Sequence, residues 1–164
     1  MAERVEVVVA DEQDDVELDV TALAELARQV LTAEGATGEL TLTFVDTDEI
    51  TALNTEHMGI GAPTDVLSFP LDADDDEMPA GGAVPRLLGD VVVCPAVAAA
   101  AAPSHAGTVA DELALLVVHG VLHVLGYDHA EHDQAVAMRT RERALLEAHH
   151  WAGPAPAGFV HEQS

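Results

Sequence analysis

The segment from residue 119 to residue 129, His-Gly-Val-Leu-His-Val-Leu-Gly-Tyr-Asp-His, constrains this chain more than any other. His119 and His123 are four positions apart, so on a helix both imidazoles project from the same face. Gly126 can end that helix, because glycine adopts the left-handed conformation that other residues disfavour. The chain can then turn and bring His129 back toward the first two histidines. Converging imidazoles with one open coordination position are typical of a catalytic zinc, so we predict one Zn²⁺ per chain, held by His119, His123 and His129.

This histidine spacing resembles the extended zinc motif of the metzincin peptidases, with one departure. Those enzymes carry Glu directly after the first histidine, where it is the general base. Here that position is Gly120, so the metal site is predicted without the usual base of a peptidase. Asp128, beside a predicted ligand, is a candidate for the missing base, with orientation of a histidine or a surface turn as the alternatives. The catalytic residues are otherwise unknown.

The residues around the first two histidines predict a central helix. From Thr108 to Leu125 the sequence is apolar on nearly all sides, which is typical of a helix buried in a core. Glu112 lies two turns before His119 on the same face; we expect a solvated side chain, with a role near the metal as the alternative. Strand patterns occupy residues 5–10, 39–45, 64–69 and 87–94, and helix patterns residues 23–31, 47–57, 96–102 and 131–149.

We therefore predict an α+β fold, in which a small mixed four-stranded sheet packs with about five helices around a central metal-bearing helix. The length of 164 residues suits one domain. We predict a single zinc-hydrolase-like domain over residues 1–152 and a flexible C-terminal tail over residues 153–164, where Gly and Pro recur. Cys94 is the single cysteine, which excludes an internal disulfide, and we expect it to be a small buried apolar residue rather than a ligand.

The N-terminus does not read as a signal peptide, and no apolar run reaches the roughly 18 residues of a membrane span. We accordingly predict a cytoplasmic protein with no membrane partner. Acidic residues outnumber basic ones by 30 to 6, for a net charge of -24, and all the basic residues are arginines. Because nucleic-acid-binding proteins normally offer a basic surface, electrostatics alone disfavour binding of naked RNA or DNA. Solubility, a salty cytoplasm or biased codon use is the simplest explanation of the acidity.

Three segments taken together resemble the YbeY family of bacterial rRNA maturation factors. They are Pro-Thr-Asp-Val-Leu-Ser-Phe-Pro at residues 63–70, Leu-Gly-Asp-Val-Val-Val at residues 88–93, and the histidine segment. Asn54 before them, and Met138 and Glu142 after them, extend the match, which covers about residues 40–145. The histidine segment with its Gly-Tyr-Asp-His ending is highly specific.

The resemblance implies a zinc-dependent, single-strand-specific endoribonuclease that acts in 3′-end maturation of small-subunit (16S) rRNA and in ribosome quality control. The family's zinc ligands map onto His119, His123 and His129. The implied partners are rRNA and the small ribosomal subunit, with ribosomal proteins and an Era-type GTPase as further candidates. Many members have an arginine five residues before the Pro-Thr-Asp motif that is implied to act on RNA. Here that position is Met58, so the role is either absent or taken by another group, for which we name Arg86.

Thr64 and Ser68, at the rim of a predicted strand, and Arg86 are our candidates for binding substrate; Asp65 and Asp90 are further polar residues near that rim. Ordinary turn and strand capping is the alternative for these polar residues. Two other functions stay open: a metzincin-like zinc peptidase, which Gly120 disfavours, and a non-catalytic ribosome-assembly factor with a structural zinc. Because the chain is so acidic, we expect weak binding to naked RNA and delivery to the substrate through basic ribosomal proteins.

Overall fold

The computed structural model describes residues 5–71, 87–128, 131–157 and 159. The strands are β1 (Val5–Glu12), β2 (Gly38–Val45), β3 (Val66–Pro70) and β4 (Leu87–Val93). The helices are α1 (Val20–Ala33), α2 (Thr47–Met58), α3 (Pro95–Ala101), the short 3₁₀ helix η1 (Ala102–Ser104), α4 (Val109–Val124) and α5 (His132–His149). Within the described ranges, the predicted α+β class with four strands and five α-helices is confirmed, and that α4 bears a metal stays a prediction.

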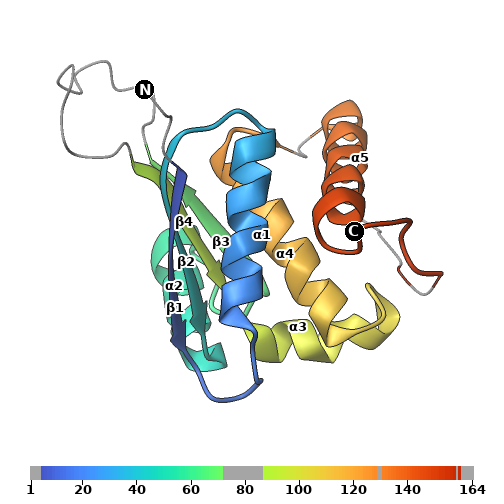
Figure 1. Cartoon of the computed structure of the whole chain (residues 1–164). Helices are drawn as coiled ribbons and strands as arrows, with labels where there is room; N and C mark the ends of the chain where they lie inside the picture. Colours follow the sequence, from blue (N-terminus) through green and yellow to red (C-terminus); the bar gives the residue numbers. More distant parts are fainter. Residues whose placement is uncertain (1–4, 72–86, 129–130, 158, 160–164) are drawn as a thin grey trace, which may run out of the picture.

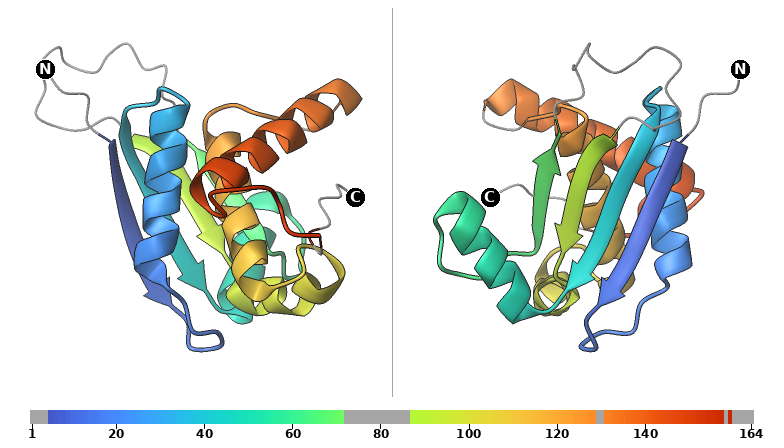
Figure 2. Two further views of the ribbon diagram at one scale, coloured as in Figure 1. Left: turned by 45° about the vertical axis from the view of Figure 1, so that its right-hand side comes forward. Right: turned by 90° about the vertical axis from the view of Figure 1, so that its left-hand side faces the viewer.

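The strands form one mixed sheet in the order β1-β2-β4-β3. β1, β2 and β4 run parallel, and β3 pairs antiparallel with β4 at the edge. Helices α1 and α4 lie side by side on one face of the sheet, and α5 packs on their outer side (Figure 1). Helix α2 lies beyond β3, on the side away from β4, as the right-hand view of Figure 2 shows. The layers are therefore a sheet, a pair of helices and an outer helix on one side, with α2 packed near the β3 edge on the other face.

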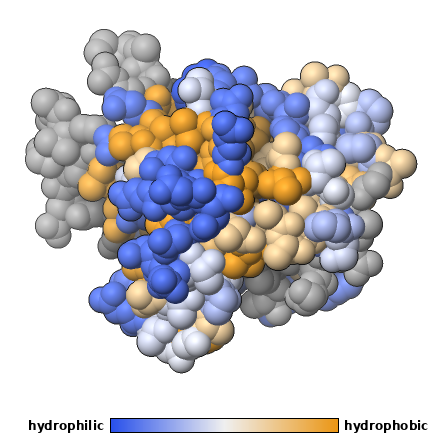
Figure 3. Space-filling view, turned by 90° about the horizontal axis from the view of Figure 1, so that it is seen from below, coloured by the Kyte–Doolittle hydropathy of each residue, from blue (hydrophilic) through white to orange (hydrophobic). Residues whose placement is uncertain are grey.

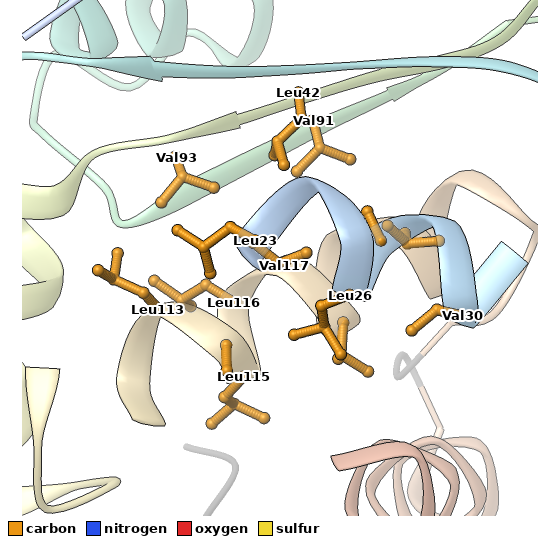
Figure 4. Close-up of a cluster of buried hydrophobic side chains, with 14 of the residues drawn as sticks. Leu23, Leu26, Val30, Leu42, Val91, Val93, Leu113, Leu115, Leu116 and Val117 are labelled. Atoms are coloured by element: carbon orange, nitrogen blue, oxygen red, sulfur yellow. The ribbon is translucent and has the colours of Figure 1, made fainter. Parts of the chain in front are cut away.

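The main core lies between the sheet and the α1–α4 pair. Figure 4 shows Leu42 and Val91 from the sheet facing Leu23 of α1 and Val117 of α4. The buried positions of α1 match the stripe that the sequence predicts, namely Leu23, Leu26, Ala27, Val30 and Leu31. Asp19 is the N-cap of α1, and its carboxylate accepts a hydrogen bond from the Ala22 N–H at 3.1 Å.

Helix α4 is central, as predicted, and buries residues on nearly all sides along its length. Thr108 caps its start, where the Thr108 side chain accepts from the Asp111 N–H at 3.1 Å. At its end, Gly126 has a φ of 107°, its N–H donates to the His123 carbonyl, and the Tyr127 N–H donates to the Leu122 carbonyl, both at 3.0 Å. This pair of bonds is the Schellman cap, so the predicted glycine stop after His123 is confirmed.

A smaller core lies on the opposite face of the sheet. Ile50 of α2 packs there with Leu67, Val92 and Cys94, and Cys94 is fully buried, as expected. Within the described ranges, no single helix is long and apolar enough to cross a membrane, although one bent pair, Pro95–Ser104 with Val109–Val124, passes by length and composition.

Some boundaries differ from the sequence expectation. β3 begins at Val66 and ends at Pro70, where the sequence predicts residues 64–69, and α2 runs one residue further than expected, to Met58. The Asp46 side chain caps α2 by accepting from the Glu49 N–H at 2.8 Å. The division into a domain and a tail stays a prediction. In the described part of that tail, the Ala155 N–H donates to the Glu147 carboxylate at 3.1 Å, and Phe159 is buried.

Gly120 is the point where α4 comes closest to the sheet. A Cβ built on it would lie 2.6 Å from Cγ1 of Val91 and 3.3 Å from Oγ of Ser68. From the sequence, Gly120 is only the position where the general base of a peptidase is missing. In the fold, a glycine is needed there for packing. Real Cβ atoms do not approach a neighbour so closely, and the buried, β-branched Val91 has little freedom to move.

We therefore predict that Gly120→Ala destabilises the protein by about 1–3 kcal/mol through overpacking. In a solvent-exposed helix the same change stabilises by roughly 0.5–1 kcal/mol, so the sign of the change in unfolding free energy shows whether position 120 is crowded. Denaturant unfolding of Gly120→Ala, Val91→Ala and the double variant measures it. Because Val91→Ala makes room for the new methyl group, the double variant should lose less stability than the two single losses combined. A Gly120→Ala protein more stable than wild type would contradict the packing argument.

A three-residue contact ties the end of α4 to α1 and α5. The Tyr127 hydroxyl donates to Oε1 of Glu34 at 2.8 Å, and Nε of Arg141 donates to Oε2 of the same carboxylate at 2.5 Å. Burial raises the pKa of the Tyr127 hydroxyl above its ordinary value, and the hydrogen bond to Glu34 raises it further. The folded state therefore favours the protonated phenol.

We predict that this contact is lost in alkali. A raised folded pKa contributes stability that is present below the ordinary tyrosine pKa of about 10 and disappears as pH rises through the folded value. Tyr127→Phe, which lacks the hydrogen bond, should be less stable by about 1 kcal/mol at neutral pH. The gap between wild type and variant should narrow above about pH 10. The chain has no lysine and one tyrosine, so a pH series of unfolding curves isolates the effect. A constant gap would show that the phenol does not titrate as argued.

Candidate active site

The first two predicted ligands lie together on α4. The ring centroids of His119 and His123 are 4.6 Å apart, and the rings meet edge to face at 78°. Their spacing on successive turns therefore produces the adjacency that the sequence predicts. The third predicted ligand, His129, lies outside the described residues. Among the residues that are described, no three His, Cys, Asp or Glu side chains gather as a metal site.

A buried carboxylate holds the first histidine. Glu142 of α5 is fully buried, and its Oε2 lies 2.5 Å from Nδ1 of His119. A carboxylate accepts hydrogen bonds, so the tautomer that suits this contact carries its proton on Nδ1 and leaves Nε2 to bind a metal. Histidines that bind metals through one nitrogen commonly donate the other N–H to a carboxylate. The chemistry of this pair therefore fits a metal ligand better than a histidine that only packs.

Sequence reasoning missed this contact, although a signal for it exists. Glu142 follows Met138 by four residues and precedes the buried Leu145 and Leu146, so it occupies the apolar stripe of α5. A carboxylate at such a position needs a buried partner, because an unpaired charge in a core is costly. The resemblance includes Met138 and Glu142, yet the sequence alone does not name His119 as the partner.

The histidines line a cleft of about 390 Å³ at the edge of the sheet. Strand β3 and the residue before it supply most of the wall, with Met58 from the end of α2. The lining residues are Met58, Asp65, Val66, Leu67, Ser68, Pro70, His119 and His123. The edge of the sheet thus brings a strand, two imidazoles and an exposed methionine to one hollow.

Gly120 faces the sheet, toward Val91 of β4 and Ser68 of β3. Its carbonyl accepts a hydrogen bond from the Ser68 hydroxyl at 3.2 Å, and Val91 fills the space where its side chain would be. A glutamate at this position would meet Val91 before it reached the histidines. The glutamate of a metzincin peptidase is therefore absent from this position and disfavoured there by packing.

The structure separates the other predicted site residues. Asp65 and Ser68 line the cleft, and the Asp65 carbonyl accepts from the Cys94 N–H at 2.9 Å. Thr64 is half-buried and lies one residue before the described lining begins. Asp90 is half-buried in β4, and Asp128 is exposed after the cap of α4. Arg86 lies outside the described residues.

The expectation that Glu112 is solvated is wrong. Its side chain is 1% exposed, its carboxylate lies 2.8 Å from Nδ1 of His105, and it accepts from the Ala106 N–H at 3.1 Å. His105, which makes this contact, is half-buried. Glu112 therefore braces the turn before α4, at the opposite end of the helix from His123.

A second hollow of about 630 Å³ lies where the β1–α1 connection meets the start of α4. Leu18, Leu23, Val109 and Leu113 give it apolar walls, and His150 also reaches it. Figure 3 views the molecule from below and shows hydrophobic surface beside a group of hydrophilic residues. Nε2 of His150 lies 2.8 Å from the Asp111 carboxylate, so this imidazole is already engaged. The cleft beside His119 is the better candidate for chemistry.

Comparison with known proteins points to one family. Residues 8–150 match the profile of the family described as Endoribonuclease YbeY. A protein named Endoribonuclease YbeY from Salinispora tropica is 44% identical over 137 residues, which cover 79% of this chain and 87% of that protein. The protein of the same name from Thermobifida fusca is 41% identical over 136 residues, covering 82% of this chain and 88% of the relative.

A solved structure has the same fold. The solution structure of TM1509 from Thermotoga maritima superposes with a TM-score of 0.60 at 29% sequence identity, covering 86% of this chain and 87% of that one. The family profile spans the sheet, the histidine pair of α4 and Glu142 of α5, which together form the cleft and its support. This chain belongs to the YbeY family of endoribonucleases.

Proposed function

We propose that this chain is a zinc-dependent endoribonuclease that cuts single-stranded RNA. Its role would be the maturation of the 3′ end of small-subunit (16S) rRNA and ribosome quality control. The observation that carries the proposal is the histidine pair on α4, with Glu142 fixing His119, at the wall of a cleft in a chain of this family. The carboxylate leaves Nε2 of His119 as the nitrogen that binds a cation.

The ligands of the zinc would be His119, His123 and His129. Bound zinc would supply a Lewis acid for a phosphoryl group and a source of hydroxide near neutral pH. The residues of the chain hold the ligands and the substrate in place. Glu142 orients the imidazole of His119, and β3 forms the wall along which an RNA strand can lie. Gly120 offers no proton acceptor, and Asp128 stays our candidate for the base because it follows α4 closely and is exposed.

The charge of the molecule bears on its partners. Three of the described arginines are paired with glutamates, Arg28 with Glu25, Arg141 with Glu34 and Arg143 with Glu147. No arginine is among the described residues that line the cleft. Electrostatic attraction for RNA is therefore weak, and we propose that basic ribosomal proteins of the small subunit bring the enzyme to its rRNA, with an Era-type GTPase as a further partner. Such partners would place the protein in the cytoplasm.

We predict that His119→Ala, His123→Ala and His129→Ala each lose most of the bound zinc and cut a single-stranded rRNA fragment at least 100-fold more slowly, because two imidazoles make a poor zinc site. His132→Ala, an exposed histidine at the start of α5, is the matched control and should keep both properties. Elemental analysis and gel-based cleavage assays measure the two. A chelator should abolish cleavage by wild type.

These assays also separate the alternatives. If one of the three histidine variants kept as much bound zinc as wild type, the substituted histidine would not be a zinc ligand. Chelator-sensitive cleavage of casein, but not of RNA, would support a peptidase. Failure to cut either polymer, with retention on small ribosomal subunits, would support an assembly factor whose zinc is structural.

A further prediction concerns Glu142. Glu142→Gln keeps the size and an acceptor oxygen but loses the charge, so zinc affinity should fall by about 10–100-fold. Glu112→Gln is a close control, because Glu112 is equally buried and also contacts a histidine Nδ1, yet lies at the other end of α4. Both variants should lose stability, but only Glu142→Gln should lose zinc affinity, as measured by competition with a chromophoric chelator. Equal zinc affinities in the two variants would contradict a role for Glu142 in holding the ligand.

A further inference from the structure

The hydrogen bonds of β3 determine which of its main-chain groups face outward. The Asp65 carbonyl accepts from the Cys94 N–H at 2.9 Å, and the Leu71 N–H donates to the Leu88 carbonyl at 3.0 Å. In an antiparallel pair, the N–H and C=O of one residue point to the same side, and successive residues alternate. Residues 65, 67, 69 and 71 therefore bond toward β4. Val66, Ser68 and Pro70 direct their main-chain groups away from it.

Pro70 agrees with this assignment. Proline has no N–H, so inside a strand it is tolerated where the N–H would point away from the neighbouring strand. Pro70 lies in β3 opposite Gly89, and its main-chain groups point away from β4, as those of Val66 and Ser68 do. The outer side of β3 therefore presents two N–H donors, on Val66 and Ser68, beside the carbonyls of the same residues. Along a strand such groups repeat about every 6.8 Å.

This outer side borders the cleft. β3 is the last strand of the described sheet, and α2 lies beyond it (Figure 2). Met58 of α2 and five successive or near-successive residues of the β3 segment line the same hollow as His119 and His123. A polymer that lies along β3 therefore passes the two imidazoles.

The main-chain groups along this edge of β3 are uncharged, and each donor has an acceptor beside it. Val66 and Ser68 each offer a donor next to an acceptor, and the only ionisable group on the described wall, apart from the two imidazoles, is the carboxylate of Asp65. Such a wall does not favour phosphates, which need positive charge. It matches the Watson–Crick edge of an unpaired base, where a donor also lies next to an acceptor. Proteins that bind single-stranded RNA commonly hydrogen-bond this edge. In a duplex those base edges are occupied.

We propose that the outer main-chain edge of β3, at Val66 and Ser68, hydrogen-bonds the Watson–Crick edges of unpaired bases and so selects single-stranded RNA for this cleft. The exposed side chain of Met58 supplies an apolar wall for the base faces. This inference rests on the proposed ribonuclease function and names how that site recognises its substrate. Because main-chain groups make the contact, recognition depends on an unpaired base more than on its identity.

The test uses the zinc-loaded protein and two single-stranded RNA oligonucleotides of one sequence. Both contain uridine only, and in one of them every base is blocked by methylation on its Watson–Crick edge as N3-methyluridine, which carries no charge, while sugars and phosphates are unchanged. Fluorescence anisotropy measures binding, and single-turnover kinetics measure cleavage. We expect the blocked strand to bind at least tenfold more weakly, because a site built to hydrogen-bond leaves its groups unpaired. The affinity for the unblocked strand should fall little as salt rises, since few phosphates are neutralised.

A variant addresses the protein side. Val66→Pro removes one outward N–H without removing a bond to β4, and we expect it to reduce the preference for the unblocked strand by roughly fivefold, the worth of one hydrogen bond. Circular dichroism checks its fold, and if the variant does not fold, the wild-type comparison still decides. Equal binding of both strands by wild type would overturn the inference, as would a steep negative salt slope, which signals phosphate recognition. If wild type prefers the unblocked strand yet cuts neither, the inference stands and the proposed nuclease function fails.

Discussion

The position of the histidine pair depends on how closely α4 approaches the sheet. At Gly120 the helix backbone comes so near Val91 that no side chain fits between them. This contact fixes the rotation of α4 about its own axis. With position 120 turned to the sheet, positions 119 and 123 flank the contact and reach the edge at β3. The same contact leaves no room for a carboxylate directly after His119.

Polar contacts then support a site that packing has positioned. Two buried glutamates brace the two ends of α4, Glu112 through His105 at the start and Glu142 through His119 toward the end. Both carboxylates are desolvated, so each gains from a hydrogen-bonded partner and would be costly without one. The Glu34 carboxylate plays a comparable part beyond the helix, where Tyr127 and Arg141 meet on it. The acidity of the chain is thus partly internal architecture and partly surface.

Much of this arrangement is readable from local sequence. The stripe of α1, the apolar α4, the Gly126 stop and the adjacency of His119 and His123 all follow from helical periodicity and glycine geometry. The burial of Glu112 and the pairing of Glu142 with His119 are not readable in this way, since each depends on a residue that only tertiary folding brings near. Likewise, the sequence identifies Gly120 as glycine but not which face of the helix meets the sheet. Long-range polar contacts, not element types, were the missing part.

The burial of α4 has a consequence for when the protein becomes active. The helix that carries the histidines also contributes Leu113, Val117, Val121 and other side chains to the main core. Its docking joins β4, α1 and α5, so the chain must be nearly complete before the histidines, Glu142 and β3 come together. A copy in which α5 has not docked lacks the contact between Glu142 and His119. Assembly of the cleft and completion of the fold are therefore one event.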